Sequence, residues 1–174
     1  NHHRGFSFKE SGPLDMRMGN QTGPTASEII NLCSEATLAD LIFFYGQERK
    51  ARKIAKRIVA ERKKRKINTT LELAQIIRAI VPKNFKKDPA TKTFQAIRIA
   101  VNNELKDLSR ALTFAEKIII KGGIIAVVTF HSIEDKIVKD FGKIMSGKAS
   151  LTNRYRPPTS KTFASLIPCL LYTS

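Results

Sequence analysis

The sequence has only two cysteines, Cys33 and Cys169, among its 174 residues. Their spacing matches neither a disulfide framework nor a zinc site, so we expect a reducing compartment and no structural metal. No apolar run approaches the roughly 20 residues that a membrane-spanning helix needs. No charged and then apolar leader opens the chain either. We therefore expect a cytoplasmic protein that makes no use of a membrane.

The short motifs of several enzyme classes are also missing. There is no Gly-rich phosphate loop, because the glycine pair at 122–123 precedes a predicted strand instead of following one. There is no Gly-x-Ser-x-Gly turn, and His131 and Ser132 are adjacent with diverging side chains, so a Ser-His-Asp triad is not supported. Nucleophilic hydrolysis is therefore disfavoured.

Acidic residues are scarce beside basic ones, since 15 Asp and Glu stand against 31 Lys and Arg, a formal net charge of +16. A field of this sign indicates a polyanionic partner, with nucleic acid as the first candidate. Basic residues are densest over 49–66, where we predict phosphate contacts, although a solvated surface is the alternative. The predicted contacts to an RNA backbone are Arg49, Arg52, Lys53, Lys56, Arg57, Arg62 and Lys63.

Hydrophobic periodicity predicts helices along most of the chain. Thr25 and Thr69 are each followed three residues later by Glu, a capping-box pattern at the start of a helix. Between them, Thr37 precedes a helix that Gly46 ends, and an amphipathic helix covers about 48–66. The region 25–87 holds helical patterns alone. We interpret it as an all-helical domain inserted into an α/β domain, after a structured loop over 1–24.

The region 88–146 has the order of a parallel α/β sheet: helix, Gly-Gly turn, strand, helix. Asp88 is predicted to cap one long helix whose apolar stripe continues toward residue 121. The run 124–130 is nearly all apolar, which is typical of a strand buried on both faces, and Ser132 and Asp135 are predicted to cap the next helix. Such a strand needs neighbours on both edges. We therefore expect that the chain is part of a larger α/β protein.

Three groups of residues are candidates for a site. Ligands of open α/β sheets bind beyond the carboxyl ends of strands, where this sequence has His131, Ser132 and Asp135; simple helix capping is the alternative. The loop over 4–18 combines aromatic and charged side chains with turn formers, as site loops often do. On the long predicted helix, Arg98 and Asn102 are four residues apart on one face. The last two groups together are Arg4, Phe6, Phe8, Asp15, Arg17, Gln95, Arg98 and Asn102.

Taken together, these strings resemble one family, the RsmH or MraW small-subunit ribosomal RNA cytosine-N4 methyltransferases. The resemblance covers about residues 4–141, and the strings occur in the family's order. They are RGFSF at 4–8, GPLDMRM at 12–18, YG at 45–46, ER at 48–49, PA at 89–90, TFQAIR at 93–98, VN at 101–102, EL at 104–105, GG at 122–123, FHSIED at 130–135 and IVK at 137–139.

The resemblance implies a partial Rossmann-like class I methyltransferase domain with an inserted helical domain for RNA recognition. It implies methyl transfer from S-adenosylmethionine to N4 of a cytidine, with small-subunit ribosomal RNA or the small ribosomal subunit as partner. His131, Ser132 and Asp135 are then expected on the catalytic rim, and the loop and helix residues named above beside the target base. No metal is expected.

The departures from the family pattern concern the two ends and a few positions. The family's Gly-rich cofactor loop lies before Asn1, so we expect no cofactor-binding residues in this chain and no activity from it alone. Asp88 stands where the family usually has His. Residues 147–168 are expected to form an extended loop, and 169–174 are interpreted as a non-native tail read from a sequencing adapter.

Two other functions stay open at this stage. One is a non-catalytic RNA-binding or ribosome-associated protein whose helical region is its whole function. The other is a helix-turn-helix DNA binder, which is disfavoured because no short helix pair is joined by a tight turn and because the buried strand has no place in it. A start codon near Asn1 would favour the first of these, and an upstream strand with a Gly-rich turn would favour catalysis.

Overall fold

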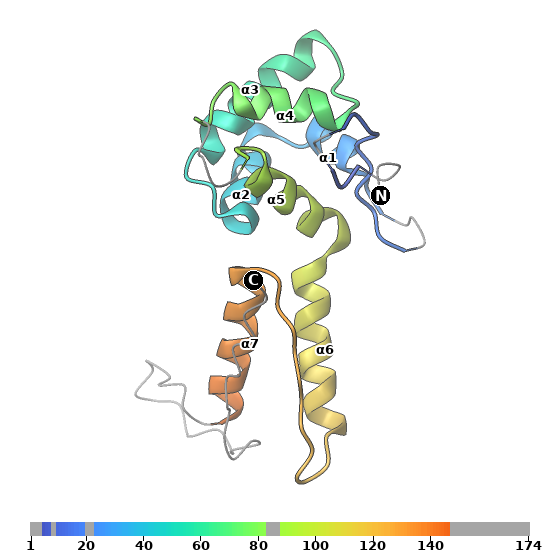
Figure 1. Cartoon of the computed structure of the whole chain (residues 1–174), viewed down its shortest axis with the longest axis vertical. Coiled ribbons are helices and arrows are strands. Elements are labelled where there is room, and N and C mark those ends of the chain that lie inside the picture. The colour runs from blue at the N-terminus through green and yellow to red at the C-terminus, as the bar shows by residue number, and fades with distance from the viewer. Residues whose placement is uncertain (1–4, 8–9, 20–22, 83–87, 147–174) are drawn as a thin grey trace. The chain divides into compact units, whose positions relative to one another are not determined.

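The computed structural model describes residues 5–7, 10–19, 23–82 and 88–146, and within them it contains seven helices and no β-strand (Figure 1). The chain divides into two compact units, Asn1–Glu104 and Leu105–Ser174. Of the helices in the described ranges, none is long and apolar enough to cross a membrane. The first unit joins the N-terminal loop and α5 to the helical region, so its boundary differs from the predicted inserted domain at 25–87. That domain assignment stays a prediction about the complete protein.

Two helices of the first unit begin where their capping boxes predict. In α1 (Ala26–Leu32), the Glu28 amide donates to the Thr25 hydroxyl at 3.1 Å, and the Thr25 amide donates to the Glu28 carboxylate at 2.8 Å. In α4 (Thr70–Arg78), Thr69 and Glu72 exchange the same two bonds at 3.3 and 3.1 Å. Each box satisfies amides that the first helical turn leaves without partners. Both predicted starts are confirmed.

The second helix begins earlier than predicted. In α2 (Glu35–Gly46) the N-cap is Ser34, whose hydroxyl accepts from the Thr37 amide at 3.1 Å, so the predicted start after Thr37 is wrong. Ser and Thr are both good N-caps, and the earlier one lets the helix gain a turn. The helix ends at Gly46 as predicted, where a Cβ would lie 2.6 Å from the Lys92 carbonyl oxygen of α5. Glycine therefore permits close packing of the two helices there.

The core of the first unit lies between α2, α3 (Ala51–Lys64) and α5 (Thr91–Asn102). α2 packs against both α3 and α5, α4 packs against α3, and α1 contacts α3 and α5. The apolar stripe predicted for the third helix is buried, and the loop before α1 contributes two more apolar side chains. The fully or nearly fully buried members include Leu14, Met16, Ile30, Leu38, Ile42, Ile54, Ile58, Leu73, Ile77 and Ile97.

The long helix predicted from Asp88 toward residue 121 is in fact two helices. α5 begins at Thr91 with Ala90 as its N-cap, so the predicted cap at Asp88 is wrong, although the Asp88 carboxylate accepts from the Ala90 amide at 2.8 Å. α6 spans Glu104–Ile118. Asn103 separates them in the left-handed conformation, with φ of 52°. A left-handed residue ends regular helical hydrogen bonding. The prediction of one helix was wrong because the apolar stripe continues through the break.

In the second unit, the run 124–130 forms no strand, which corrects the prediction of a buried one. Its side chains are largely exposed, with Ile124 at 92%, Val128 at 73% and Phe130 at 87% of their full accessibility. A strand exists only through hydrogen bonds to a neighbour, and no described segment lies in register beside this one. Other large apolar side chains of the unit are exposed too, namely Phe114, Ile118, Ile120 and Ile144. This unit therefore carries apolar surface of the kind that a sheet would bury.

Candidate functional site

The loop before α1 is held in place by the start of α4. The Thr70 amide donates to the Gly12 carbonyl at 2.9 Å, and the Thr70 hydroxyl accepts from the Gly12 amide at 3.1 Å while donating to the Glu10 carbonyl at 3.0 Å. Next along the chain, the Leu14 amide donates to the Asn68 carbonyl at 3.2 Å. Since Leu14 and Met16 are buried in the core, this loop is a packed part of the unit.

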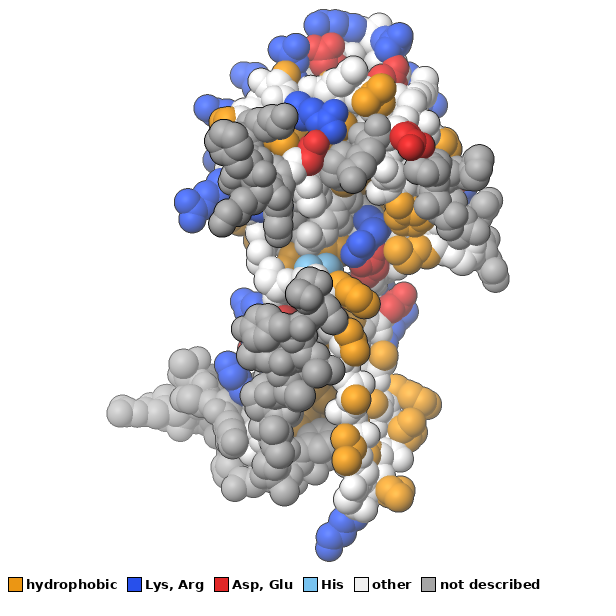
Figure 2. Space-filling view, in the orientation of Figure 1, with side chains coloured by type: hydrophobic (Ala, Val, Ile, Leu, Met, Phe, Trp, Pro, Cys, Tyr) orange, Lys and Arg blue, Asp and Glu red, His pale blue; other side chains and the backbone are white. Residues whose placement is uncertain are grey.

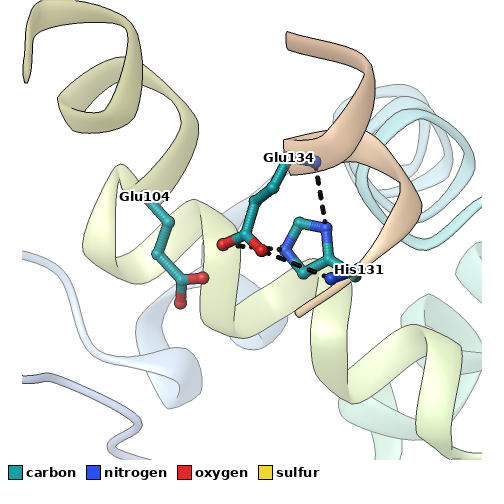
Figure 3. A group of neighbouring side chains, drawn as sticks. All are labelled: Glu104, His131 and Glu134. Atoms are coloured by element: carbon teal, nitrogen blue, oxygen red, sulfur yellow. Dashed lines mark hydrogen bonds and ion pairs between the residues drawn. The ribbon is translucent and has the colours of Figure 1, made fainter. Parts of the chain in front are cut away.

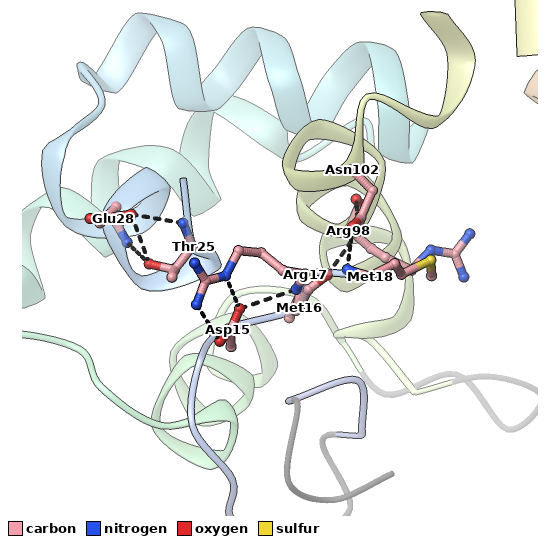
Figure 4. Close-up of polar contacts among 8 residues, drawn as sticks. All are labelled: Asp15, Met16, Arg17, Met18, Thr25, Glu28, Arg98 and Asn102. Atoms are coloured by element: carbon pink, nitrogen blue, oxygen red, sulfur yellow. Dashed lines mark hydrogen bonds and ion pairs between the residues drawn. The ribbon is translucent and has the colours of Figure 1, made fainter. Parts of the chain in front are cut away.

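Alternating with these two buried side chains, Asp15 and Arg17 form an ion pair (Figure 4). Arg17 Nε donates to Asp15 Oδ1 at 2.6 Å, a terminal guanidinium nitrogen donates to Asp15 Oδ2 at 2.8 Å, and the Arg17 amide donates to Oδ1 at 3.2 Å. The side chains keep 25% and 19% of their accessibility, for Asp15 and Arg17 respectively. The hydrogen bond with Asp15 raises the pKa of the Arg17 guanidinium above its ordinary value. The ion pair thus favours the charged form that a guanidinium has in proteins.

Asn102, at the end of α5, contacts the same loop through both ends of its amide. Its Nδ2 donates to the Met16 carbonyl at 2.8 Å, and its Oδ1 accepts from the Met18 amide at 2.7 Å (Figure 4). A second Nδ2 hydrogen bond, at 2.9 Å, goes to the Arg98 carbonyl one turn earlier. The structure therefore brings three of the predicted substrate residues, Asp15, Arg17 and Asn102, into one cluster.

The other predicted substrate residues are placed differently. The guanidinium of Arg98 pairs with Glu104 at 2.8 and 3.0 Å, so Arg98 and Asn102 use their polar groups on different partners. Gln95 Nε2 donates to the Tyr45 carbonyl at 3.5 Å. Phe6 packs against the core, partly buried. Arg4 and Phe8 lie outside the described residues. A role for these residues in substrate binding stays a prediction.

The three predicted catalytic residues lie together at the start of α7 (Ser132–Met145). The N-cap is His131, whose Nδ1 accepts from the Glu134 amide at 3.3 Å, while Glu134 Oε2 accepts from the His131 amide at 3.3 Å (Figure 3). The predicted cap formed by Ser132 and Asp135 is therefore wrong by one residue. Glu134 was missed because a capping pattern is ordinarily sought from Ser or Thr, and here histidine takes that role.

Some of the other polar atoms at the start of α7 have hydrogen-bond partners and, among the described residues, one does not. Asp135 Oδ2 accepts from Lys139 Nζ at 2.7 Å, one turn along α7. The other ring nitrogen of His131, Nε2, is buried and makes no hydrogen bond within the described part of the chain. Its nearest acid is Glu134, with Oε1 at 3.5 Å. A buried ring nitrogen without a partner is unusual in a folded protein, and a catalytic role for His131, Ser132 and Asp135 stays a prediction.

α3 and the chain beside it form a basic surface, visible as the crowd of Lys and Arg side chains at the upper end of Figure 2. One predicted phosphate contact is used inside the protein: Arg62 donates to the carbonyls of Ile30 and Cys33, at 2.6 and 2.7 Å. Arg57 pairs with Glu61 at 3.0 Å. The others are exposed and have no ion partner among the described residues. These five are Arg49, Arg52, Lys53, Lys56 and Lys63.

Comparison with known proteins identifies close relatives. The sequence profile of the MraW methylase family matches residues 1–162. The ribosomal RNA small subunit methyltransferase H of Gluconobacter oxydans is 50% identical over 155 residues, which are 88% of this chain and 48% of that protein. The protein of the same name from Rhodospirillum centenum is 53% identical over 147 residues, or 84% and 44% of the two chains. The chain thus spans about half the length of the curated relatives that it matches.

Proposed function

Because the chain belongs to the MraW methylase family, we propose that its full-length protein methylates N4 of a cytidine in small-subunit ribosomal RNA. The methyl donor in this proposal is S-adenosylmethionine, and the fold is that of a class I methyltransferase. The observation that carries the proposal is the profile match over 1–162 together with about 50% identity to proteins named ribosomal RNA small subunit methyltransferase H. A ribosomal RNA substrate would be met in the cytoplasm, and a cytoplasmic location is part of this proposal.

The cofactor does not fit the described residues. Class I folds hold such a group at the Gly-rich turn after a strand, and this part of the chain has neither a strand nor such a turn. We therefore place that site in the half of the relatives that this chain does not cover, and we expect the 174-residue chain alone to be inactive. Calorimetry that detects micromolar binding of S-adenosylmethionine to this chain would overturn that expectation.

The part of the relatives that this chain does not cover would also account for the apolar surface of the second unit. Residues 124–130 have the composition of a central strand but no neighbours, and side chains such as Ile124 and Phe130 are exposed. Strands from the rest of the domain would supply both the ladder hydrogen bonds and the apolar cover. His131, Ser132 and Asp135 would then follow the carboxyl end of that strand, which is where sites of such sheets lie.

The loop over 10–18 is suited to holding a cytosine base. A carboxylate recognises cytosine by accepting a hydrogen bond from its N4 amino group, and the two oxygens of a carboxylate such as Asp15 can each accept more than one hydrogen bond. The amino nitrogen is a weak nucleophile because its lone pair is delocalised into the ring. Orientation by Asp15 would favour a pyramidal amino nitrogen, whose lone pair is less delocalised and available for bond formation, and orientation of this kind supplies a large share of such a barrier reduction.

The basic surface on α3 would supply RNA affinity. Its exposed cations, Lys53, Lys56 and Lys63 among them, can contact phosphates without reading sequence. Selection of one cytidine would then come from the shape of the ribosomal RNA around it and from exposure of the base to the pocket. In this proposal the α3 cations set the affinity for RNA, and the loop over 10–18 orients the base.

The test compares full-length protein with its Asp15→Asn variant on purified small ribosomal subunits, with transfer of a labelled methyl group as readout. Asparagine keeps the size of the side chain but loses the charge that accepts from the cytosine amino group and holds Arg17. We expect kcat to fall about 100-fold or more, in the range found when a reacting group is misplaced by a small distance. Full activity in the variant would remove Asp15 from the mechanism, and no transfer by the parent would contradict the proposed function.

A further inference from the structure

We propose that Asn102 is a positioning residue that fixes the backbone on both sides of Arg17 and thereby aims the Asp15–Arg17 pair at the RNA base. The inference rests on the proposed methylation of cytidine. In this proposal Asn102 acts through the loop and does not contact the substrate itself. Its two amide hydrogens and one oxygen lone pair are already used by the Met16 carbonyl, the Arg98 carbonyl and the Met18 amide.

The geometry of this contact is that of a neighbouring strand. In a β-ladder, the carbonyl of one residue and the amide of the residue two further on point to the same side and bond the same neighbour. The Met16 carbonyl and the Met18 amide are such a pair, and the primary amide of Asn102 satisfies both, at 2.8 and 2.7 Å. The residue between them is Arg17. Fixing both of its flanking peptide groups sets the direction in which its side chain leaves the chain.

The backbone at Met16 has an unusual conformation that contacts with the rest of the unit must stabilise. Met16 adopts the left-handed conformation, with φ of 59°, which side chains other than glycine, asparagine and aspartate rarely take. Its side chain is buried in the core, so the conformation is held from inside by packing and from outside by Asn102. Unusual backbone conformations persist only where the surroundings over-determine them, and they concentrate at functional sites. The Asp15–Arg17 pair spans this residue.

Of the side chains of similar size, only that of asparagine can both donate to the Met16 carbonyl and accept from the Met18 amide without moving the loop. Aspartate can accept from the Met18 amide, but its charged oxygen would face the Met16 carbonyl, which is also an acceptor. Leucine has a similar size and bonds neither group. Glutamine carries both groups one methylene further out, and it therefore keeps the chemistry while moving the loop.

The chain contains a matched control in Asn31 of α1. Its Nδ2 donates to the Ile67 carbonyl at 2.8 Å, its Oδ1 accepts from the Ile67 amide at 3.1 Å, and Nδ2 also donates to the Ser27 carbonyl one turn earlier at 2.8 Å. Asn31 thus makes the same kinds of backbone bond as Asn102, but to a single residue of the connection between α3 and α4, and its Nδ2 also lies 3.2 Å from the Ser27 hydroxyl. A purely structural role predicts equal consequences for the two residues.

The experiment measures kcat and KM for methyl transfer to small ribosomal subunits, together with Tm, for the full-length protein and its N102D, N102Q and N31D variants. We expect N102D and N31D to lower Tm alike. We expect N102D to lower kcat about 100-fold, the order of loss that a shift of about 1 Å causes, with KM little changed because the α3 cations set affinity. N102Q tests the same point in a neutral variant, and we expect it to lose less Tm than N102D and still to lose kcat.

Equal kcat for N102D and N31D at equal loss of Tm would overturn the inference, and so would full kcat in N102Q. A rise in KM with unchanged kcat would also overturn it, because that result would mean direct contact with the RNA. Activity of the unsubstituted protein separates this failure from failure of the proposed function. If the parent transfers no methyl group to the ribosomal RNA, the proposed function itself is refuted.

Discussion

Replacing Arg62 should lower the stability of the first unit. A replacement that keeps its positive charge should not weaken RNA binding. Arg62 lies among the basic residues of α3, but its guanidinium donates to the carbonyls of Ile30 and Cys33 at the end of α1, at 2.6 and 2.7 Å. A hydrogen bond to a charged group contributes roughly 1.5–3 kcal/mol. Because the side chain is partly exposed, water can replace part of both bonds. We therefore expect Arg62→Met to lower the free energy of unfolding by about 2–3 kcal/mol.

Arg62→Lys separates geometry from charge in this experiment. Lysine keeps the positive charge but presents one ammonium in place of a planar fork, so it can reach one carbonyl well and the other poorly. We expect about half the loss seen for Arg62→Met, by the same hydrogen-bond magnitude. The exposed Arg52 is the control, and Arg52→Met should change the free energy of unfolding by less than about 0.5 kcal/mol.

The assay is urea unfolding followed by circular dichroism, run beside RNA binding at fixed salt. The structure predicts that Arg62→Lys binds RNA like the parent and unfolds more easily. The reasoning is refuted if Arg62→Met unfolds like Arg52→Met, or if Arg62→Lys keeps full stability and loses affinity. The first result would mean that the contact of the guanidinium with α1 contributes nothing to stability, and the second would mean that the guanidinium binds the RNA.

Three further predictions concern RNA affinity, acid stability and a helix end. Replacing Lys53, Lys56 and Lys63 with Gln should reduce the slope of log affinity against log salt by about 0.7–0.9 for each phosphate that is no longer neutralised; an unchanged slope would exclude this face from binding. Hydrogen bonds, first from the Asn68 amide, lower the pKa of Glu72 below its ordinary 4.5, so the stability it contributes is present above pH 4.5 and is lost as the pH falls through the lowered pKa. Glu72→Gln still accepts these bonds but does not titrate, so the free energy of unfolding should depend less steeply on pH below 4.5 in this variant. An unchanged pH dependence would mean that another group causes the acid sensitivity. Gln47 is left-handed, with φ of 51°, so Gln47→Gly should raise the free energy of unfolding by about 0.5–1 kcal/mol in urea; a loss of stability would show that the Gln47 side chain matters more than its backbone.

Features that depend on neighbours in the sequence could be predicted. The starts of α1 and α4 follow from Thr25 and Thr69 because a capping box needs only four consecutive residues. The buried stripe of α3 follows from helical periodicity alone. Local hydrogen bonding and one-sided burial therefore account for most of the helical part of the chain.

Features that depend on distant groups could not be predicted in this way. A strand at 124–130 needs partners that no described segment supplies, so its apolar composition alone did not produce one. The break at Asn103 leaves the apolar stripe intact, and therefore hydropathy does not reveal it. Arg62 is indistinguishable from its basic neighbours in sequence, because its role depends on the carbonyls of α1 packed against it.

The candidate site was predicted in part. Asp15, Arg17 and Asn102 were chosen from composition and spacing, and the structure places them together across more than 80 positions of sequence. Their arrangement was not predictable, because it depends on the left-handed Met16 and on a side-chain amide acting in place of a strand. Arg98 was predicted to lie on one face with Asn102, but its guanidinium binds Glu104, a pairing across the turn at Asn103.

Identification of the modified nucleoside tests the central claim most directly. Full-length protein, S-adenosylmethionine and unmethylated small ribosomal subunits would be incubated together, and the RNA would be digested to nucleosides for mass spectrometry. The account predicts one new product, a cytidine carrying its methyl group on N4. A methyl group on another atom or another base, or no transfer to ribosomal RNA by a protein that binds the donor, would contradict it.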